Sequence, residues 1–200
     1  MDNPITIVPI VEGHGEVTAL PVLLRRVASR IDPTIYIDIK NPIRVPKTKL
    51  VREGLERYVQ LAANKGGAEG RIFILIDSDQ SCPASLGPDL LQRAIIARPD
   101  RTISVVLANT EFESWFLAGA SGIAGQRGLP EDLQPPSDPE AIRDAKGWIS
   151  TKMVGQTYKE TLHQAAFADT FNMDDALDES LPQFSDSFDK FWRECSKLVM

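Results

Sequence analysis

Two short apolar segments that end in acidic residues constrain the fold of this chain most strongly. Residues 6–12 read TIVPIVE and residues 71–79 read RIFILIDSD, so both are rich in β-branched residues and both close on carboxylates. Continuous apolar runs of this length are typical of strands that are buried on both faces of a parallel sheet. Open parallel sheets bind ligands at the carboxyl ends of their strands. We therefore expect the acids of the two segments to lie close together.

Helical and extended patterns alternate through the first part of the chain. Strands separated by helices imply right-handed crossovers and a mostly parallel sheet. The pattern predicts an α/β core over residues 1–120, with about four strands flanked by helices. Besides the two apolar segments, strands are predicted over residues 34–39 and 102–108, and helices over residues 17–30, 47–64 and 89–97.

The remainder of the chain contains no predicted strand. Residues 121–138 are rich in Gly, Pro, Ser and Asp, which indicates a long loop or linker. The residues after it have helical patterns, so we expect residues 139–200 to form a helical extension that packs on the core. Helices within this extension are predicted over residues 139–153, 159–167, 174–177 and 187–198.

The composition excludes several functional classes. The net charge of −6, from 28 acidic and 22 basic residues, argues against a protein that coats nucleic acid by charge alone, because Lys and Arg supply most of that affinity. Cys82 and Cys195 are too few for a disulfide framework or a thiolate metal cage, so we expect free thiols. No apolar stretch approaches the roughly 20 residues of a spanning helix, and residues 1–20 do not resemble a signal peptide. We expect a cytoplasmic protein with no membrane association.

One basic segment, residues 44–52, contains no acidic residue. It reads RVPKTKLVR, and its cations could contact the phosphates of a polyanion. The alternative is a solvated helix face, which is the more frequent role of such a segment. The candidate nucleic-acid-binding residues are Arg44, Lys47, Lys49 and Arg52.

The first apolar segment continues into the turn Glu12-Gly-His-Gly-Glu16. Its two glycines permit a tight turn and a close approach of the backbone to a bound group, and Glu16 lies in the first turn of a predicted helix. In the alternative interpretation the glycines only form the turn, and the Glu16 carboxylate interacts favourably with the helix dipole. The segment lacks the glycine motifs of dinucleotide-binding and P-loop proteins, which disfavours nucleotide binding in those modes.

The second apolar segment ends in Asp77-Ser-Asp79. Side chains two residues apart point the same way in an extended chain, so both carboxylates can bind one hard cation. Mg²⁺ usually takes one or two carboxylates and leaves the rest of its coordination shell to water and phosphate oxygens. The alternative is an Asx-turn that ends the strand. Clustering two unpaired acids at a sheet end is electrostatically unfavourable, which favours the metal interpretation.

A third acidic segment follows the strand predicted over residues 102–108. Thr110 and Glu113 fit a capping box, in which each side chain accepts a hydrogen bond from a backbone N–H at the start of a helix. This helix also begins at the carboxyl end of a strand. Glu113 could therefore join the other acids, whether or not it serves as a cap.

The order of these motifs resembles the Toprim domain shared by topoisomerases, bacterial primases and the overcoming-lysogenization-defect nucleases. Glu12-Gly follows one apolar strand, Asp77-x-Asp79 follows another, and the fuller Glu12-Gly-x-x-Glu16 form is closer to the nuclease branch. The resemblance covers residues 4–120 and implies a Toprim/Rossmann-like α/β fold.

The whole chain is similar to the bacterial domain-of-unknown-function family numbered 4276. The residues that carry this second resemblance are Glu113-Ser-Trp115, Tyr158-Lys159 and Ser185-x-Ser187-Phe188.

The Toprim resemblance implies a site for phosphodiester hydrolysis that binds one or two Mg²⁺ (or Mn²⁺) ions. It implies that Asp77 and Asp79 bind metal and that Glu12 serves as a metal ligand or a general acid–base group. It also implies that Glu16 and Glu113 complete a second metal position. Two ions about 4 Å apart can activate a water molecule and stabilise the leaving oxygen.

Two lysines are candidates for stabilising charge in the transition state. They are Lys146 and Lys159, and the alternative for each is an ordinary surface lysine. His14 is expected in an exposed turn and His163 on a helix surface.

Two functional hypotheses follow. The first is a metal-dependent nuclease that acts on DNA or RNA, and the second is a catalytically weak Toprim-fold module for regulation or protein binding. No topoisomerase tyrosine, primase zinc motif or ATPase signature is visible. Because related domains often work beside an ATPase, a separate ATPase partner is expected, with a role in defence against phage.

Overall fold

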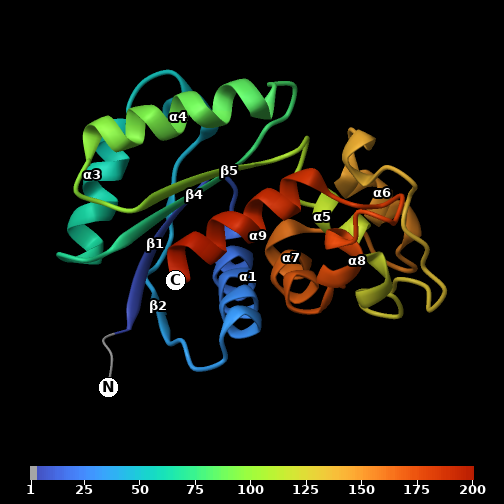
Figure 1. Ribbon diagram of the computed structural model, residues 1–200. Coiled ribbons are helices and arrows are strands. Elements are labelled where there is room, and N and C mark those ends of the chain that lie inside the picture. Colours follow the sequence, from blue (N-terminus) through green and yellow to red (C-terminus); the bar gives the residue numbers. More distant parts are fainter. Residues whose placement is uncertain (1–3) are drawn as a thin grey trace.

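Five strands form the centre of the molecule, whose residues 4–200 are described by a computed structural model (Figure 1). The strand order is β2-β1-β4-β5, and β3 pairs with β1 beyond the end of β2. Every strand pair in these residues is parallel, which confirms the predicted α/β fold with a mostly parallel sheet. The strands are β1 (Ile5–Val11), β2 (Ile37–Ile39), β3 (Ile43–Arg44), β4 (Arg71–Asp77) and β5 (Ile103–Ala108).

Helices cover both faces of this sheet. In Figure 1, α3 and α4 lie on one side of the strands, and α1 and α9 lie on the other. The helices are α1 (Glu16–Ile31), α2 (Lys47–Val51), α3 (Leu55–Gly66), α4 (Pro83–Ala97), α5 (Ser114–Ala118), α6 (Ala145–Lys152), α7 (Glu160–Thr170), α8 (Met173–Leu177) and α9 (Asp186–Val199), with short 3₁₀ turns η1 (Ala120–Gly122) and η2 (Pro139–Ala141).

The alternation of side chains along β4 divides the core into two layers. Ile72, Ile74 and Ile76 belong to the layer under α3 and α4, whereas Phe73 and Leu75 belong to the layer under α1 and α9. Successive side chains of a strand point to opposite faces, so an apolar strand must be covered on both sides. All five of these side chains are buried, as the continuous apolar run predicts.

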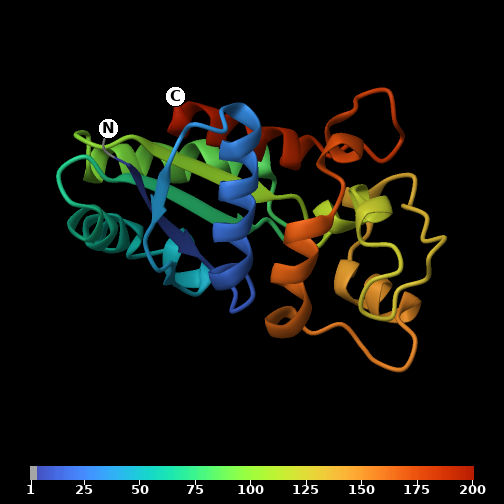
Figure 2. The ribbon, with the colours of Figure 1, turned by 90° about the horizontal axis from the view of Figure 1, so that it is seen from below.

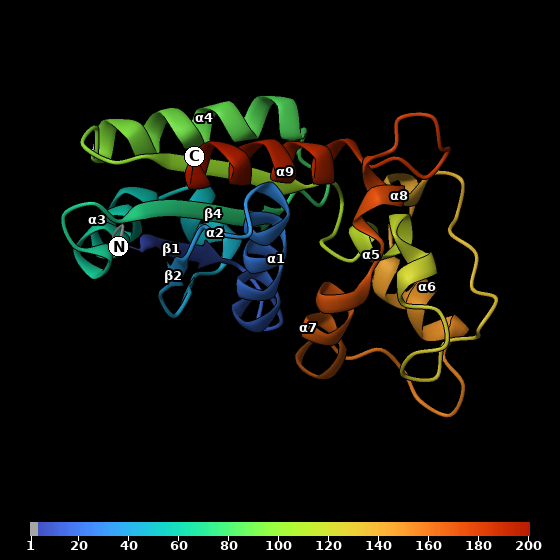
Figure 3. The same cartoon turned by 60° about the horizontal axis from the view of Figure 1, so that its bottom comes forward.

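The C-terminal helix α9 completes one of these layers. Figure 3 shows α9 running beside β5 and across one end of α1. The rings of Phe188 and Phe191 pack on Trp115 at centroid distances of 5.4 and 5.0 Å, and Phe191 meets Phe73 of β4 at 5.4 Å. Burial of each such side chain contributes roughly 1.5–3 kcal/mol. One face of the sheet is therefore built from both ends of the chain.

Several element boundaries differ from the predicted ones. The second strand begins at Ile37 rather than at residue 34, and the short strand β3 was not predicted. The predicted helix over residues 47–64 is two helices, because Gly54 lies between them at φ 108°, a left-handed conformation that glycine adopts readily. The helix predicted to start at residue 89 begins at Pro83, since proline suits the first turn of a helix.

The segment between α5 and α6 is irregular but packed. Residues 121–138 contain no strand and no α-helix, yet Ile123, Leu129 and Leu133 are buried in the layer beneath α9 and α1. The helix predicted over residues 139–153 is a 3₁₀ turn followed by α6. This segment therefore folds against the core.

No helix within residues 4–200 is both long enough and apolar enough to cross a membrane. Cys82 is exposed and Cys195 is buried, and both are free thiols, as predicted.

Candidate functional site

The parallel strands bring several acids to one end of the sheet. Glu12 directly follows β1, Asp77 is the last residue of β4, and Glu113 lies shortly after β5. The register pairs Asp77 with Ala108, the last residue of β5, so the two strands end together. Figure 2 shows that the segments drawn in yellow and orange, which include α6 and α7, lie beyond one end of the sheet.

Glu113 is the most deeply buried acid of this cluster and has no exposed surface. Its Oε1 accepts hydrogen bonds from the Tyr158 hydroxyl at 2.9 Å and from the Gln164 amide at 3.0 Å. Its Oε2 lies 3.1 Å from the Lys146 ammonium. Burial raises the pKa of Glu113 to about 6, although the nearby Lys146 and Tyr158 oppose the rise. The carboxyl group therefore titrates in the weakly acidic range.

The capping box predicted for Thr110 and Glu113 is wrong. Helix α5 begins at Ser114 with no side-chain cap, and the Thr110 hydroxyl donates instead to the carbonyl of Glu140 at 3.1 Å. The Glu113 carboxylate is held by side chains from the C-terminal part of the chain. Tertiary hydrogen bonds have replaced the local pattern, and they direct this acid into the cluster.

Lys146 of α6 supplies positive charge inside the cluster. Its Nζ lies 3.1 Å from Glu113, 3.4 Å from Glu111 and 3.5 Å from Glu160. Burial alone would lower the pKa of Lys146, but the carboxylates of Glu113, Asp77 and Glu111 raise it above its ordinary value. Lys146 therefore stays protonated and acts as a counter-ion for several acids.

Gln164 of α7 joins Glu16 to Glu113. Its fully buried amide donates to Glu16 Oε1 at 3.2 Å and to Glu113 Oε1 at 3.0 Å. Burial raises the pKa of Glu16, and the hydrogen bond from Gln164 opposes the rise. A Cβ atom at Gly13 would collide with the Glu16 carboxylate, and one at Gly15 would collide with the Gln164 amide. The turn is glycine-rich because side chains of the cluster fill the space beside it.

Asp77 lies among the other carboxylates at the end of β4. It is partly buried, and its Oδ1 accepts a hydrogen bond from the Phe112 N–H at 2.8 Å. Burial raises the pKa of Asp77 well above its usual range, and the carboxylates of Glu113 and Glu16 raise it further. Lys146 only partly opposes this effect. A cation bound beside Asp77 would therefore stabilise its ionised form.

Glu12 and Asp79 form the outer part of the cluster. The Lys47 ammonium lies 2.6 Å from Asp79 Oδ2 and donates to the Ser78 carbonyl at 2.8 Å. Burial raises the pKa of Glu12, and the Asp79 carboxylate adds to the rise. Of the four predicted nucleic-acid-binding residues, Lys47 is thus already engaged within the protein.

The other three cations of the basic segment face solvent. Arg44, Lys49 and Arg52 are exposed, and none of them forms a salt bridge within the described residues. Lys49 and Arg52 line a shallow hollow together with Arg57. These cations are therefore available to an anionic partner.

Two residues of the outer part adopt an uncommon backbone conformation. Asp79 has φ 51° and Thr110 has φ 64°, in the left-handed region that residues other than glycine rarely adopt. The Asp79 N–H donates to the Thr110 carbonyl at 3.0 Å, and the Thr110 N–H donates to Ser78 Oγ at 2.8 Å. Strained residues of this kind concentrate at functional sites, where the surrounding structure holds them. The link fixes the loops after β4 and β5 relative to each other.

A cavity lies beside this link and contains an arginine that no sequence motif indicated. Its lining residues are Asp79, Gln80, Thr110, Glu111 and Arg143. Arg143 is exposed and forms no salt bridge in residues 4–200. A guanidinium group with free donors suits a phosphate, which it can bind through two hydrogen bonds.

Lys159 lies near Lys146. It is exposed and lines a shallow hollow together with Lys146, Tyr158 and His14. The surface position predicted for His163 is wrong, because this side chain is only 4% exposed and stacks on Tyr158 at a centroid distance of 5.6 Å. The ring is held there because His163 Nδ1 accepts a hydrogen bond from the Lys159 N–H at 2.8 Å.

The chemistry of these side chains suits a hard divalent cation, but the ligands are not preassembled. Within residues 4–200, no group of three or more His, Cys, Asp or Glu residues is spaced to hold a metal ion. Oε2 of Glu12 and Oε2 of Glu16 are buried and accept no hydrogen bond from the described residues. Such oxygens are unfavourable in isolation, and carboxylate oxygens are preferred ligands of Mg²⁺. The side chains are therefore of the type that binds Mg²⁺, but they would have to rotate to coordinate one ion.

The fold and these side chains define an α/β protein with a carboxylate cluster at the carboxyl ends of a parallel sheet. A family model described as Domain of unknown function (DUF4276) matches residues 11–192. The chain therefore belongs to this family, which confirms that part of the resemblance seen in the sequence. The comparisons with curated proteins and with solved structures found no match.

Proposed function

We propose that the protein is a Mg²⁺-dependent, Toprim-like nuclease that hydrolyses phosphodiester bonds in DNA or RNA. The observation that supports this proposal is the convergence of carboxylates from the ends of three parallel strands. Four of them have raised pKa values, chiefly because burial disfavours the charged form of each carboxyl group. These residues are Glu12, Glu16, Asp77 and Glu113. Divalent cations compensate such charge and are the usual cofactors of phosphodiester cleavage.

Two groups of side chains would hold the cations. Asp77 and Asp79, with Glu12 beside them, would bind the first ion, and the Phe112 N–H would keep the Asp77 carboxylate in place. Glu16 is available for a second position. When bound, Mg²⁺ supplies a polarised phosphodiester and a more acidic water molecule.

The buried residues behind Glu113 would orient the second position. Tyr158 and Gln164 both donate to Glu113 Oε1, which leaves Oε2 facing Lys146. A carboxylate whose orientation is fixed by such partners binds a cation with less reorganisation. Lys146 would move away from Glu113 toward the substrate, where its charge would stabilise the transition state.

Glu12 is the best-placed acid to exchange a proton with water. It is only partly buried, and burial and Asp79 raise its pKa above its ordinary value, which makes the carboxylate a better proton acceptor. The free guanidinium of Arg143 and the exposed ammonium of Lys159 flank the cluster on two sides. A nucleic-acid strand that crosses the cluster would bring a phosphate to each of them. Further phosphates of the strand would contact Arg44, Lys49 and Arg52.

The second candidate function is a catalytically weak Toprim-like module that binds a protein partner. The observation that favours it is the internal neutralisation of the acids, since Lys146 and Lys47 occupy positions beside carboxylates that a cation would take. A separate ATPase, acting in defence against phage, would then be the partner that rearranges these lysines.

The decisive experiment compares the wild type with Asp77→Asn in a cleavage assay with mixed DNA and RNA and with Mg²⁺ or Mn²⁺. Asparagine keeps the acceptor for the Phe112 N–H and removes the charge, so we expect the variant to remain folded and to lose activity by at least roughly a hundredfold. The matched control is Asp89→Asn, at an exposed aspartate of α4 outside the cluster. No cleavage by the wild type with either metal, with and without a candidate ATPase, would leave only the binding module.

A further inference from the structure

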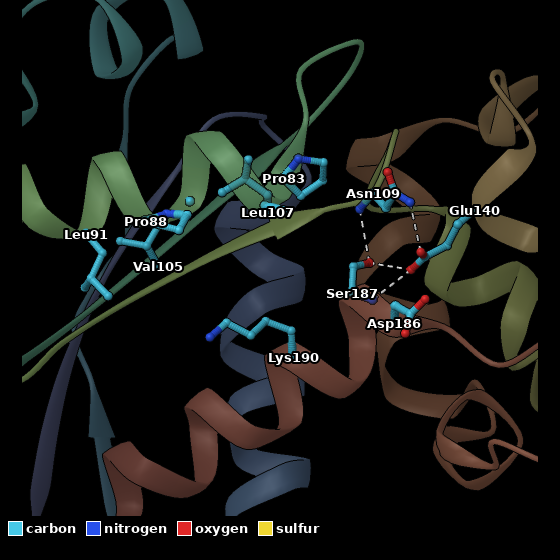
Figure 4. A pocket seen from close by; sticks show the side chains of 12 residues that line it. Pro83, Pro88, Leu91, Val105, Leu107, Asn109, Glu140, Asp186, Ser187 and Lys190 are labelled. Carbon is cyan, nitrogen blue, oxygen red and sulfur yellow. Dashed lines mark hydrogen bonds between the residues drawn. The ribbon is translucent and has the colours of Figure 1, made fainter.

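An apolar groove lies along the free edge of the sheet, on the side of β5 away from β4. Figure 4 shows that Pro88 and Leu91 of α4 form one wall and Lys190 of α9 lies on the other, with Val105 and Leu107 of β5 between them. The cavity has a volume of about 330 Å³. It takes no part in the proposed function, because the carboxylate cluster lies at the strand ends.

The hydrogen-bond pattern of β5 leaves backbone groups unpaired in this groove. Ile72 N–H donates to the carbonyl of Thr102, and Ser78 N–H donates to that of Ala108. In a parallel ladder every second residue of a strand bonds to a given neighbour. The even-numbered residues of β5 therefore bond to β4, and Val105 and Leu107 direct their N–H and C=O groups to the free edge.

These groups are unusual because they are unpaired although they belong to buried residues. Val105 and Leu107 are each 4% exposed, and their backbone groups have no partner outside the ladder in the described residues. Most buried backbone groups in proteins are hydrogen-bonded, and unpaired ones are costly. The groups that would satisfy this edge are those of another extended chain.

One end of the groove is closed. There the N–H of Asn109 donates to Ser187 Oγ at 3.1 Å, and Ser187 Oγ donates to Glu140 Oε1 at 2.6 Å (Figure 4). Helix α9 thus supplies the next edge partner in place of a strand. An added strand would end at this point, and it would pair with Val105 and Leu107 on the way.

The two walls differ in charge. The α4 wall is apolar, whereas the α9 wall presents Lys190, whose side chain is 44% exposed, and carries Asp186 near the closed end. Lys190 pairs with Glu194 at 2.7 Å, but Glu194 also binds Lys197 at 2.8 Å and Ser104 at 2.8 Å. Glu194 would remain paired if Lys190 turned toward another acid. The groove therefore suits a strand with apolar residues on the face toward α4 and an acidic residue on the other face where the strand passes Lys190.

We propose that the groove between α4 and α9 binds an extended segment of a partner protein, which adds to β5 as a sixth strand. Alternate apolar side chains of this segment pack on α4, and an acidic side chain on its opposite face pairs with Lys190. A second copy of this chain is a poorer occupant, because the helices that flank its own β5 would meet α4 and α9. A small apolar molecule would fill the cavity but would leave the backbone groups of Val105 and Leu107 unpaired.

The test uses the full-length protein and the acetylated, amidated heptapeptide VTVEVTV, whose valines and glutamate lie on opposite faces of a strand. We expect binding by titration calorimetry and at least roughly tenfold slower hydrogen exchange at the amides of Val105 and Leu107. The same peptide with N-methyl groups on its pairing edge should not bind. Absence of VTVEVTV binding at about 1 mM, or binding without slower exchange at these amides, overturns the proposal.

Two variants test the walls separately. A Cβ at Gly87 of α4 would lie 3.6 Å from Leu107, an ordinary contact, so Gly87→Ala should leave binding nearly unchanged while Gly87→Leu fills the groove and weakens binding at least roughly tenfold. Lys190→Glu should weaken VTVEVTV and favour VTVKVTV. Equal affinity for Gly87→Leu and the wild type contradicts the site. Concentration-dependent dimerisation that Gly87→Leu abolishes would instead identify a second copy as the occupant and overturn the proposal.

Discussion

The inner and outer parts of the carboxylate cluster contain the same kinds of side chain in different surroundings. The inner acids, Glu16 and Glu113, are buried and are held by side chains of α6 and α7. The outer acids, Glu12 and Asp79, come from the strand ends alone and are partly or largely exposed. Strand topology is therefore sufficient to position the outer acids, whereas the inner ones depend on the C-terminal half of the chain.

The difference in depth decides how much each neighbouring lysine contributes. The side chain of Asp79 is 60% exposed, so water screens its ion pair with Lys47, and pairs of this kind contribute about 0–1 kcal/mol. The side chain of Glu113 is 0% exposed, and its ion pair with Lys146 is largely shielded from water. Removing one partner of a buried pair leaves the other charge unsolvated. The inner lysine should thus matter more for folding than the outer one.

The largest expected effect is on stability. Lys146→Met should lower the free energy of unfolding at pH 7 by about 2–4 kcal/mol, because the buried Glu113 carboxylate would lose its counter-ion. Lys47→Met, the matched change in the outer part, should lower it by less than about 1 kcal/mol. Urea denaturation followed by circular dichroism measures both values. Equal losses in the two variants would remove the distinction between inner and outer acids.

The next effect is a dependence of stability on pH. The pKa of Glu113 rises from its ordinary 4.5 to about 6 on folding, so between these values the folded protein binds more protons than the unfolded chain. The stabilising contribution is present below pH 4.5 and is lost as the pH rises through 6. At 1.36 kcal/mol per pKa unit, this amounts to about 2 kcal/mol.

The substitution Glu113→Gln isolates this contribution from those of the other acids. Glutamine keeps an acceptor for Tyr158 and Gln164 and does not titrate. As the pH rises from 4.5 to 6, the free energy of unfolding should therefore fall less in the variant than in the wild type. Urea denaturation at several pH values in this window gives the two slopes. Identical slopes would mean that Glu113 titrates with an ordinary pKa in the folded protein.

Residue positions that the backbone decides could be predicted from the sequence. The apolar runs before Glu12 and Asp77 predicted two strands, and parallel pairing brings the carboxyl ends of these strands to the same end of the sheet. The fold class followed from the same pattern. Conformation at single residues was harder to predict, since the break at Gly54 needed a left-handed backbone that the helical periodicity did not reveal.

Side-chain positions that depend on distant parts of the chain could not be predicted from the sequence. Thr110 and Glu113 fit a local capping box, but Glu113 is bound by Tyr158 and Gln164, which lie 45 and 51 residues further along. Helical periodicity cannot indicate which polar residue of α7 turns inward. Lys146 was selected as a candidate, yet its three acidic partners are evident only from the packing of α6.

The smallest expected effect is on substrate binding and concerns the outer part alone. Arg143 lies beside Asp79 with no ion pair in the described residues, so Arg143→Gln should leave the free energy of unfolding unchanged. If Arg143 binds one phosphate, its loss should weaken binding of a labelled oligonucleotide roughly eightfold at about 0.1 M salt, from a slope of about 0.9 per phosphate contact. The slope of log Kd against log salt concentration should fall by about 0.9, the value for one phosphate contact.

The control is Arg25→Gln on the exposed face of α1, where the Arg25 guanidinium donates only within its own helix. Equal weakening by both substitutions would show that overall charge, rather than a phosphate contact at Arg143, governs binding, and the functional role of the outer part would then rest on its carboxylates.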